Sequence, residues 1–412
     1  MNLSTAVPFD IAVNRLDAKT VVGSNLRTRQ WDAVPAAIRD RAFFSAGVEN
    51  VRVLEEMKRR IASDMVLDPD VAFEGKSAFV ADIRRTLGAS GDSGRLTDLG
   101  STRRLELIYD MQTVEATEFG RHEMHQTTAL LDAFPARELY REAAREVPRK
   151  WRKRWSDNKG KFYGGRMIAK INDPIWTAIS RFSRPYSPFD FGSGMGTRDI
   201  ERDEAERLGV IAPEETIEPK SQAFNAELLA GAKDYLASDA ARAMLNQAFG
   251  DQIFFKKGKA VWAGDKLMDL LDDAIAKGPN AKGSFRFGAA TGAAMNKAAV
   301  NELQSGIDGK SLVVDTSHLW HAMDRHGPRN LIREGSGETL AGQIPLGREE
   351  FANLNSLWMV PDRVVQEGGE GILFQRSVRG GILEMVLAPN RENAAVLHPV
   401  SIRKKKRGAE RS

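Results

Sequence analysis

Histidine is the residue type whose spacing in this chain most suggests chemistry. Four of the six histidines lie in the last 95 residues, at His318, His321, His326 and His398. The segment from Asp315 to Gly327 holds three of them on a predicted helix. On an ideal helix, His318 and His321 occupy neighbouring positions, and His326 lies about 80° round from His318. No carboxylate occupies a matching position, so the pattern does not favour a metal site, and we predict no metal and no cofactor.

Acid–base catalysis suits these histidines better than metal binding. The unperturbed pKa of histidine, about 6.5, allows it to take up and release protons near neutral pH. RNA can be cleaved without a metal if a base takes the 2′-hydroxyl proton, the freed oxygen attacks phosphorus, an acid protonates the leaving oxygen and a cation stabilises the developing charge. Histidine, Arg or Lys, and Ser or Thr supply all these groups. The alternatives are structural: His326 before Gly327 ends a helix favourably, His321 packs beside Trp320, and Ser401 is an ordinary strand serine.

Composition excludes several other kinds of chemistry. The chain has 412 residues and no cysteine, which excludes disulfides, thiolate metal sites and cysteine nucleophiles. Hydrophobic residues make up 42%, enough for two to four packed domains. No run approaches the ~20 apolar residues of a membrane span, and the first residues lack the basic start and apolar core of a signal peptide. We therefore expect no membrane partner.

Positive charge is unevenly distributed along the chain. The net charge is only +4, yet residues 137–170 contain twelve Lys or Arg against four Asp or Glu. Residues 403–407 form a second basic block. Such blocks suit phosphate contacts, and the candidate nucleic-acid-binding residues are Arg149, Lys150, Arg152, Lys153, Arg154, Arg403, Lys404 and Lys405. The alternative is that the first block is a solvated helix face and the second is a solubilising tail. We favour this alternative for the tail only.

An aromatic stretch from Asp173 to Arg198 is broken repeatedly by proline and glycine. Neither a long helix nor a central strand tolerates those breaks, and large rings on irregular backbone need a packed partner. A long ordered loop of this kind often contacts another molecule. The rings that would form an assembly interface are Trp176, Phe182, Tyr186, Phe189 and Phe191. A loop folded back on its own domain is an equal alternative.

Hydrophobic periodicity and turn residues predict an α+β multidomain chain, with a mainly helical N-terminal body, a mixed middle domain and a small C-terminal domain that has an antiparallel sheet. Helices are predicted at 35–63, 76–87, 98–127, 136–154, 224–249 and 267–276, and strands or hairpins at 252–262, 371–375 and 382–387. The expected organisation is an N-terminal arm 1–30, a helical region 31–135, a basic helix and aromatic loop 136–215, a helical linker domain 216–305, an α+β domain 306–407 and a tail 408–412.

The first half of the chain resembles the Mu F-type minor head proteins of tailed bacteriophages, a head-morphogenesis family. Three segments carry the likeness: a helical Ala-Phe segment at 41–51, the helix Arg104–Arg121 that starts Arg-Leu-Glu, and the run from Asp-Pro-Ile-Trp to Gly-Met-Gly-Thr-Arg-Asp at 173–199. The resemblance implies a low-copy protein at the portal or in the prohead, with portal and other capsid proteins, and DNA or RNA, as partners. It places the chain in the virion, or in the host cytoplasm during assembly.

One departure from that family concerns zinc. Many relatives carry Cys and His ligands late in this domain, whereas residues 191–196 here read Phe-Gly-Ser-Gly-Met-Gly. We therefore expect no zinc at this position. His122 and His125, three residues apart on a predicted helix, have no evident third ligand and are expected to be packed or surface residues.

Residues 311–407 resemble the phage-borne barnase–EndoU–colicin–RelE-like nuclease group. The likeness rests on Ser317-His318 with His326-Gly327, on 342–351, on Pro361-Asp362 before paired strands, and on 400–404. It implies acid–base roles for His318 and His326, phosphate binding by Arg376 and Arg379, and phosphate orientation by Ser401. The first strand of the pair, 371–375, lacks the Lys or Arg that relatives often have there.

Three functions follow as hypotheses. The first is a phage or prophage minor head protein that acts at the portal or in the prohead, during assembly or DNA packaging, and carries a nuclease-like C-terminal domain. The alternative is a metal-independent ribonuclease or toxin that is packaged in the virion or delivered by it. The third is a structural DNA-binding protein.

Overall fold

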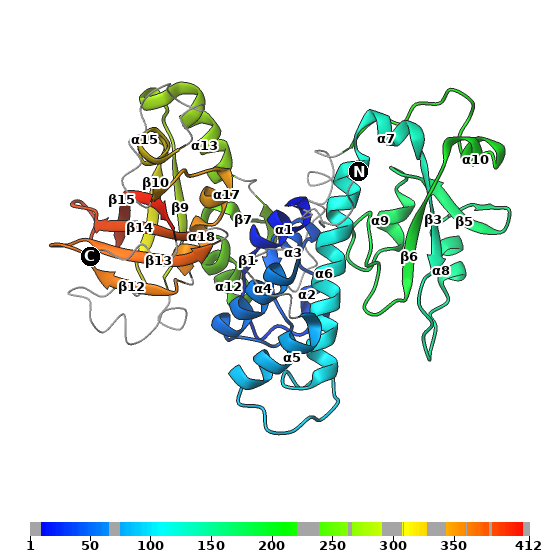
Figure 1. Ribbon diagram of the computed structural model, residues 1–412, viewed down its shortest axis with the longest axis horizontal. Coiled ribbons are helices and arrows are strands. Elements are labelled where there is room, and N and C mark those ends of the chain that lie inside the picture. The colour runs from blue at the N-terminus through cyan, green and yellow to red at the C-terminus, as the bar shows by residue number, and fades with distance from the viewer. Residues whose placement is uncertain are drawn as a thin grey trace. The chain divides into compact units, whose positions relative to one another are not determined.

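The computed structural model divides the chain into two compact units (Figure 1). It describes residues 10–65, 75–220, 239–262, 266–290, 307, 309–327, 343–359, 361–378 and 381–406. Unit 1 comprises Met1–Lys19, Val34–Asp40 and Glu56–Ala230, and unit 2 comprises Thr20–Ala33, Arg41–Glu55 and Gly231–Ser412. The chain contains both helices and strands, and the strands form several sheets with mostly antiparallel pairing. It therefore has the α+β multidomain fold that the sequence predicts.

Unit 1 combines helices with one four-stranded antiparallel sheet, whose strand order is β4-β5-β3-β6. Its helices are α1 (Asp10–Asp17), α3 (Ala36–Asp40), most of α4 (Val51–Met65), α5 (Gly75–Thr86), α6 (Thr102–His125), α7 (Thr128–Ala133), α8 (Trp151–Asp157), α9 (Ile175–Ile179) and α10 (Arg202–Arg207). Its strands are β3 (Ala136–Arg141), β4 (Phe162–Tyr163), β5 (Arg166–Lys170) and β6 (Met195–Ile200).

The long helix α6 begins where its capping residue indicates. The side chain of Ser101, just before the helix, accepts a hydrogen bond from the backbone N–H of Arg104 at 3.3 Å. This bond satisfies one of the amides that a helix leaves without a partner in its first turn. The helix predicted at 98–127 is therefore confirmed, as are the helices predicted at 76–87 and 267–276.

Residues 136–154 are not the helix that the sequence predicted. They form β3, an irregular segment and the short α8. The Arg and Glu residues repeat every four positions, and four is an even number, so the spacing fits one face of a strand as well as one face of a helix. In the structure, Glu138 pairs across the sheet with Arg166 of β5 and Arg198 of β6.

Two other expectations near the N-terminus also differ from the structure. Residues 10–30 do not form an extended arm, because α1 buries Ala12, Val13 and Leu16, and β1 (Thr20–Val21) and α2 (Thr28–Trp31) follow it. The helix predicted over 35–63 is two helices, α3 and α4, separated by β2 (Ala42–Phe43) and a loop. The Ala-Phe segment expected to be helical is thus a strand, paired in parallel with β1.

The aromatic loop folds back on its own unit. Trp176, Phe182, Tyr186 and Phe189 are buried, and Phe191 is half-buried. The Trp176 ring packs edge-on against Trp155 of α8 at 5.4 Å and stacks on Phe189 at 6.0 Å between ring centroids. The buried rings therefore belong to the core of the unit and do not form an exposed assembly interface. The alternative, a loop folded back on its own domain, is the arrangement observed.

Unit 2 is built on a seven-stranded sheet with the order β12-β13-β14-β15-β10-β9, in which β11 also pairs with β15. The strands are β9 (Ser284–Ala289), β10 (Ser311–Asp315), β11 (Gln343–Ile344), β12 (Arg363–Gln366), β13 (Ile372–Val378), β14 (Gly381–Pro389) and β15 (Val396–Lys405). The helices are α2, α12 (Asp239–Phe249), α13 (Lys266–Lys277), α15 (Thr316–His326), α17 (Arg348–Ala352), α18 (Leu354–Met359) and short 3₁₀ turns at Gly250–Gln252 and Gly278–Asn280.

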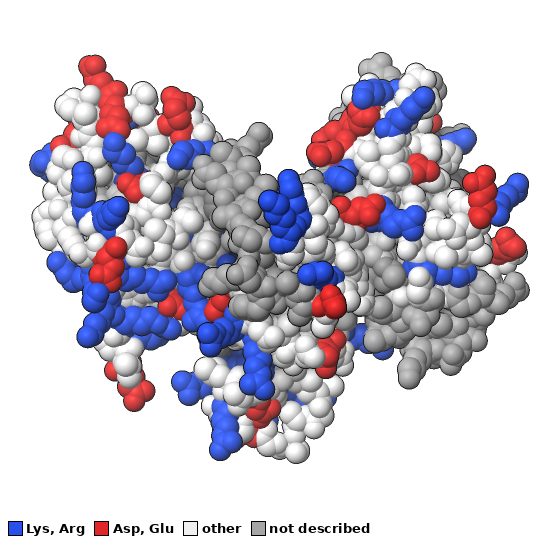
Figure 2. Space-filling model, turned by 180° about the vertical axis from the view of Figure 1, so that it is seen from behind, with Lys and Arg blue, Asp and Glu red and all other residues white. Residues whose placement is uncertain are grey.

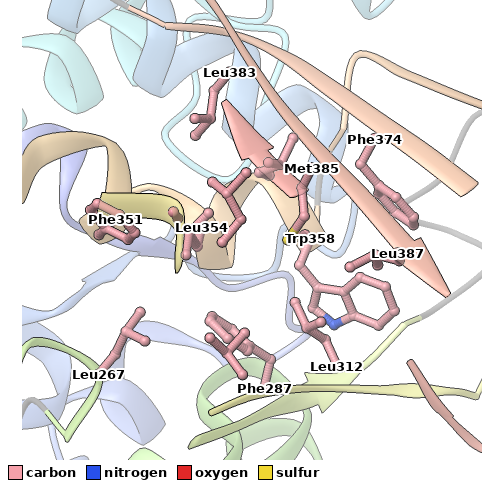
Figure 3. Close-up of a cluster of buried hydrophobic side chains, with 14 of the residues drawn as sticks. Leu267, Phe287, Leu312, Phe351, Leu354, Trp358, Phe374, Leu383, Met385 and Leu387 are labelled. Carbon is pink, nitrogen blue, oxygen red and sulfur yellow. The ribbon is translucent and has the colours of Figure 1, made fainter. Parts of the chain in front are cut away.

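The core of unit 2 lies between one face of this sheet and the helices. Phe351 of α17 and Leu354 and Trp358 of α18 meet Phe374 and Met385 from the sheet (Figure 3). Burying large side chains such as these is the main stabilising contribution, at about 25 cal/mol per Å² of apolar surface. The opposite face of β13–β15 carries polar side chains such as Gln375, Glu384 and Arg403 beside apolar ones such as Leu373 and Val386.

Both predicted hairpins are present. The strands β7 (Ile253–Lys256) and β8 (Lys259–Trp262) are joined by Lys257 and Gly258, which have φ values of 50° and 75°. Two consecutive positive φ values define the tight turn that matches the twist of a hairpin. Every residue of β13 pairs with β14, as predicted for 371–375 and 382–387. Among the described helices, none is long and apolar enough to cross a membrane.

Candidate functional site

The candidate site is a row of polar side chains on the face of β15 opposite the core face. Register places Arg403 opposite Glu384 of β14, and Glu384 opposite Gln375 of β13, so these three share one face. Alternation adds Ser401 and Lys405 to that face. The row therefore has a hydroxyl and two cations within five consecutive residues of one strand.

A bulge in β15 brings His398 into the same row. The register shifts between Val386 and Leu387, so that Val386 faces Ser401 while Leu387 faces Pro399. Val400 is the extra residue, and it is 54% exposed. Because one residue is inserted, His398 and Ser401 lie on the same face although they are three positions apart.

Glu384 is the electrostatic centre of the row. Its carboxylate accepts hydrogen bonds from Arg403 Nε at 2.6 Å and Gln375 Nε2 at 2.7 Å, and Lys405 Nζ lies 3.0 Å away. Burial alone would raise the pKa of Glu384, but these partners stabilise the carboxylate and the net effect is a lowered pKa. Arg403 also pairs with Glu367 at 3.3 Å. The two cations are thus held by two carboxylates, and an incoming phosphate would compete for them.

His326, at the C-terminal end of α15, lies within electrostatic reach of this row. Burial lowers its pKa, the charge of Arg403 lowers it further, and a hydrogen bond with the Gln343 side chain opposes both effects. The net lowering keeps the imidazole neutral at neutral pH. A neutral imidazole within the electrostatic influence of Arg403 could serve as a proton acceptor near an anion-stabilising group.

His318 has a structural role that limits its chemistry. Its Nδ1 accepts a hydrogen bond from the backbone N–H of Asp315 at 3.0 Å, as part of a reciprocal cap at the start of α15. Neutral His318 then carries its proton on Nε2, so it is a hydrogen-bond donor and not a base while the cap is intact. Burial lowers its pKa despite the nearby Asp315 carboxylate. Its ring stacks on His398, with centroids 5.8 Å apart.

Two residues assigned from the sequence face the other side of the sheet. Arg376 lies opposite Leu383 on the core face, is buried, and forms an ion pair with Glu55. Its assignment as a phosphate ligand is therefore wrong, because its charge already has a buried partner. Lys404 is also on the core face, where its Nζ lies 2.6 Å from Glu350. Its predicted contact with nucleic acid is wrong for the same reason, and Arg379 lies outside the described residues.

The basic residues 149–154 belong to unit 1, in and next to α8. Arg149 and Arg154 approach the Asp190 carboxylate at 3.3 and 3.1 Å, and Lys153 pairs with Asp157 at 2.7 Å. Lys150 and Arg152 are exposed. These five residues belong to unit 1, whereas the β15 row belongs to unit 2.

No group of His, Asp or Glu among the described residues is arranged to hold a metal ion. In unit 1, His122 and His125 are both buried, and the Nε2 of His125 lies 3.2 Å from Asp199. They are packed residues of α6, as the sequence suggested.

Sequence reasoning missed His398, Glu384 and Gln375 as members of the site. Strict alternation puts His398 and Ser401 on opposite faces, and no sequence signal marks the bulge that reverses this. The pairing of Glu384 with Gln375 could have been predicted. The β13–β14 hairpin was recognised from the sequence, and the position of its turn determines which residues lie opposite each other.

Comparison with known proteins adds no relationship. The chain matches no protein-family model, and neither a curated protein nor a solved structure matches it.

Proposed function

We propose that the chain is a minor head protein of a tailed bacteriophage or prophage, acting at the portal or in the prohead, with a nuclease-like domain at its C-terminal end. One observation carries the proposal. Two of the segments that resemble the head-morphogenesis family, 104–121 and 173–199, contact each other. Arg121 at the end of the first donates a hydrogen bond of 2.7 Å to Asp199 at the end of the second. Burial would raise the pKa of Asp199, but bonds from His125, Arg121 and Arg137 lower it, so this contact is a stable ion pair.

The test is to locate the chain during assembly. A tagged chain is expressed from its own phage or prophage, and proheads and mature particles are purified by sedimentation and imaged by cryo-EM. We expect the chain to sediment with portal-containing particles at low copy number. A chain found only free in the host cytoplasm, in lysates that contain intact particles, would contradict the proposal.

A second candidate function, metal-independent cleavage of RNA, is favoured by two observations: Ser401 and Arg403 share one face of β15, and the charge of Arg403 acts on His326. Neutral His326 would accept the proton of the RNA 2′-hydroxyl, and the resulting oxygen would attack phosphorus. The bond from phosphorus to the 5′ oxygen would break, and that oxygen would take a proton from the imidazolium form of His398, whose ring stacks on His318. Arg403 would stabilise the charge on the phosphate, and Ser401 would donate a hydrogen bond to it.

This candidate is tested with the full chain, a labelled RNA and excess EDTA. We expect cleavage in EDTA, and a loss of at least about 100-fold in rate for His326→Ala, which removes the general base. His321→Ala is the matched control, because His321 is an exposed histidine on the same helix. Cleavage that requires Mg²⁺, or that survives replacement of both His318 and His326, would exclude this site.

A further inference from the structure

A second surface, in unit 1, has the chemistry of a nucleic-acid platform. It is centred on α8, which buries Trp151 and Trp155 on one side. The Trp155 ring is fixed by a hydrogen bond from its Nε1 to the carbonyl of Lys161 at 2.8 Å. Because both tryptophans point inward, the helix presents Arg152 and Lys153 to solvent on a rigid base.

An exposed aromatic ring lies beside these cations. Phe162, on β4, is 38% exposed, and the guanidinium carbon of Arg152 lies 4.7 Å from the centre of its ring. Arg152 also donates a hydrogen bond to the carbonyl of Gly165 at 2.8 Å, which ties α8 to the β4–β5 hairpin. A guanidinium placed over a ring and fixed by a hydrogen bond is a preorganised arrangement for stacking and for phosphate binding.

The segment that joins α8 to β4 adds two more cations. Gly160 packs so closely on Trp155 that a side-chain carbon there would lie 2.4 Å from the indole nitrogen. This close approach fixes the path of the chain, and the residues on either side, Lys159 and Lys161, are both exposed. The two lysines therefore flank the same surface.

In the segment before α8, hydrogen bonds to backbone carbonyls hold two arginines in place. Arg145 and Arg149 donate hydrogen bonds to the carbonyls of Gly192 and Phe191, at 2.9 and 2.7 Å. Carbonyls fix the guanidinium groups but do not neutralise them. Arg149 also pairs with the buried carboxylate of Asp190. That single negative charge is shared among Arg149, Arg154 and Arg181.

The surface therefore keeps a large positive excess. Residues 141–161 contain nine Lys or Arg against three Asp or Glu. Figure 2 shows Lys and Arg side chains gathered in a band across the lobe that carries α8 and β4, on the left in that view. We name this set the α8 platform; its residues are Arg145, Arg149, Lys150, Arg152, Lys153, Arg154, Lys159, Lys161 and Phe162.

We propose that the α8 platform binds single-stranded nucleic acid, with phosphates along the cations and a base stacked against Phe162 and Arg152. An acidic protein surface would satisfy the charges but would make no use of the exposed ring. A duplex would also leave the ring unused, because its bases are already stacked on one another. Single strands combine both features, a charged backbone and free aromatic faces. This proposal does not depend on the nuclease-like domain.

The test measures binding of a fluorescent oligodeoxythymidylate of about 16 nucleotides to the full chain by anisotropy over a range of salt concentrations. A DNA oligomer lacks the 2′-hydroxyl, so the result is independent of any RNA cleavage. We expect the logarithm of affinity to fall linearly with the logarithm of salt concentration. The double variant Arg152→Gln, Lys153→Gln should reduce that slope by about 1.4, since each lost phosphate contact contributes about 0.7.

The ring is tested separately. Phe162→Ala should weaken binding about tenfold or more with little change in the salt slope, and Phe162→Trp should restore it. The matched control is Arg103→Gln, Arg207→Gln, two exposed arginines of unit 1 outside the platform, which should bind like the unaltered chain. Thermal melts of each variant confirm that it folds.

Three outcomes would overturn the proposal. If a duplex of the same length binds as tightly and Phe162→Ala has no effect, the surface recognises backbone charge alone. If polyglutamate competes as well as the oligonucleotide, the surface fits an acidic protein. Equal binding by the platform variant and the control variant would show that these residues do not form the site.

Discussion

At the scale of single residues, unit 1 is organised by a buried charge network. Arg184, from the aromatic loop, approaches both Asp40 of α3 and Glu115 of α6, and Lys19 also pairs with Glu115 at 2.7 Å. Burial disfavours the charged form of Asp40, but the neighbouring Arg15 and Arg184 outweigh it and lower its pKa to about 2. The network explains why the aromatic loop lies inside the unit, since removing Arg184 from it would leave buried carboxylates without sufficient positive charge.

His122 gives a pH prediction at this scale. Burial, aided by the positive charge of Arg137, lowers its pKa to about 3. The unfolded chain, with a histidine pKa of about 6.5, then binds more protons than the folded chain at mildly acidic pH. Stability that is present above pH ~6.5 is therefore lost as the pH falls toward ~3.

We expect the free energy of unfolding to fall by up to about 2 kcal/mol between about pH 7 and about pH 5 through this group. The variant His122→Phe, which cannot take up a proton, should show a correspondingly smaller fall. Urea unfolding of both proteins at the two pH values measures the difference. Asp40 does not interfere, because its titration lies at lower pH. Equal pH dependence in the two proteins would mean that His122 is not buried in its neutral form.

At the scale of elements, local signals were sufficient where they were chemically specific. The hairpin at 253–262 was predictable because its turn requires two positive φ values, which Lys257-Gly258 can adopt. The helix α6 was predictable from its length and its periodicity. β3 was not, because it is the inner strand between β5 and β6 and is buried on both faces at Ala136 and Leu139. Burial on both faces removes the alternation by which a strand is recognised.

At the scale of the whole molecule, the two units interleave along the chain. Segments 20–33 and 41–55 belong to unit 2 with the C-terminal half. Within unit 2, Glu55 pairs with Arg376 of β13, and Thr20 accepts a hydrogen bond from Asn355 at 3.1 Å. The domain predicted at 306–407 is thus only part of a larger packed unit.

This organisation predicts that the fragment 306–412 folds poorly by itself. The fragment lacks Glu55, so the buried Arg376 would lose this carboxylate partner, at a cost of about 3–5 kcal/mol. In the full chain, Glu55→Gln should produce a loss of similar size in the free energy of unfolding. Circular dichroism and urea titration provide both measurements.

The matched control for this prediction is the exposed pair Arg348–Asp272, where Asp272→Asn should cost less than about 1 kcal/mol. A fragment that unfolds cooperatively with the stability of the full chain would show that residues 20–55 are not needed by unit 2.

The sequence by itself determined the α+β class, the helices α5, α6, α13 and α15, the hairpins and the residue types available for acid–base and phosphate chemistry. These depend on local periodicity, capping and turn geometry, which neighbouring residues control. Only the tertiary structure decided which charges remain available. It paired Arg376 with Glu55 and Lys404 with Glu350 on the core face, engaged His318 in a helix cap, and turned His398 to the polar face through a bulge. Each of those outcomes depends on a partner or a register far away in the chain, and local sequence does not encode either.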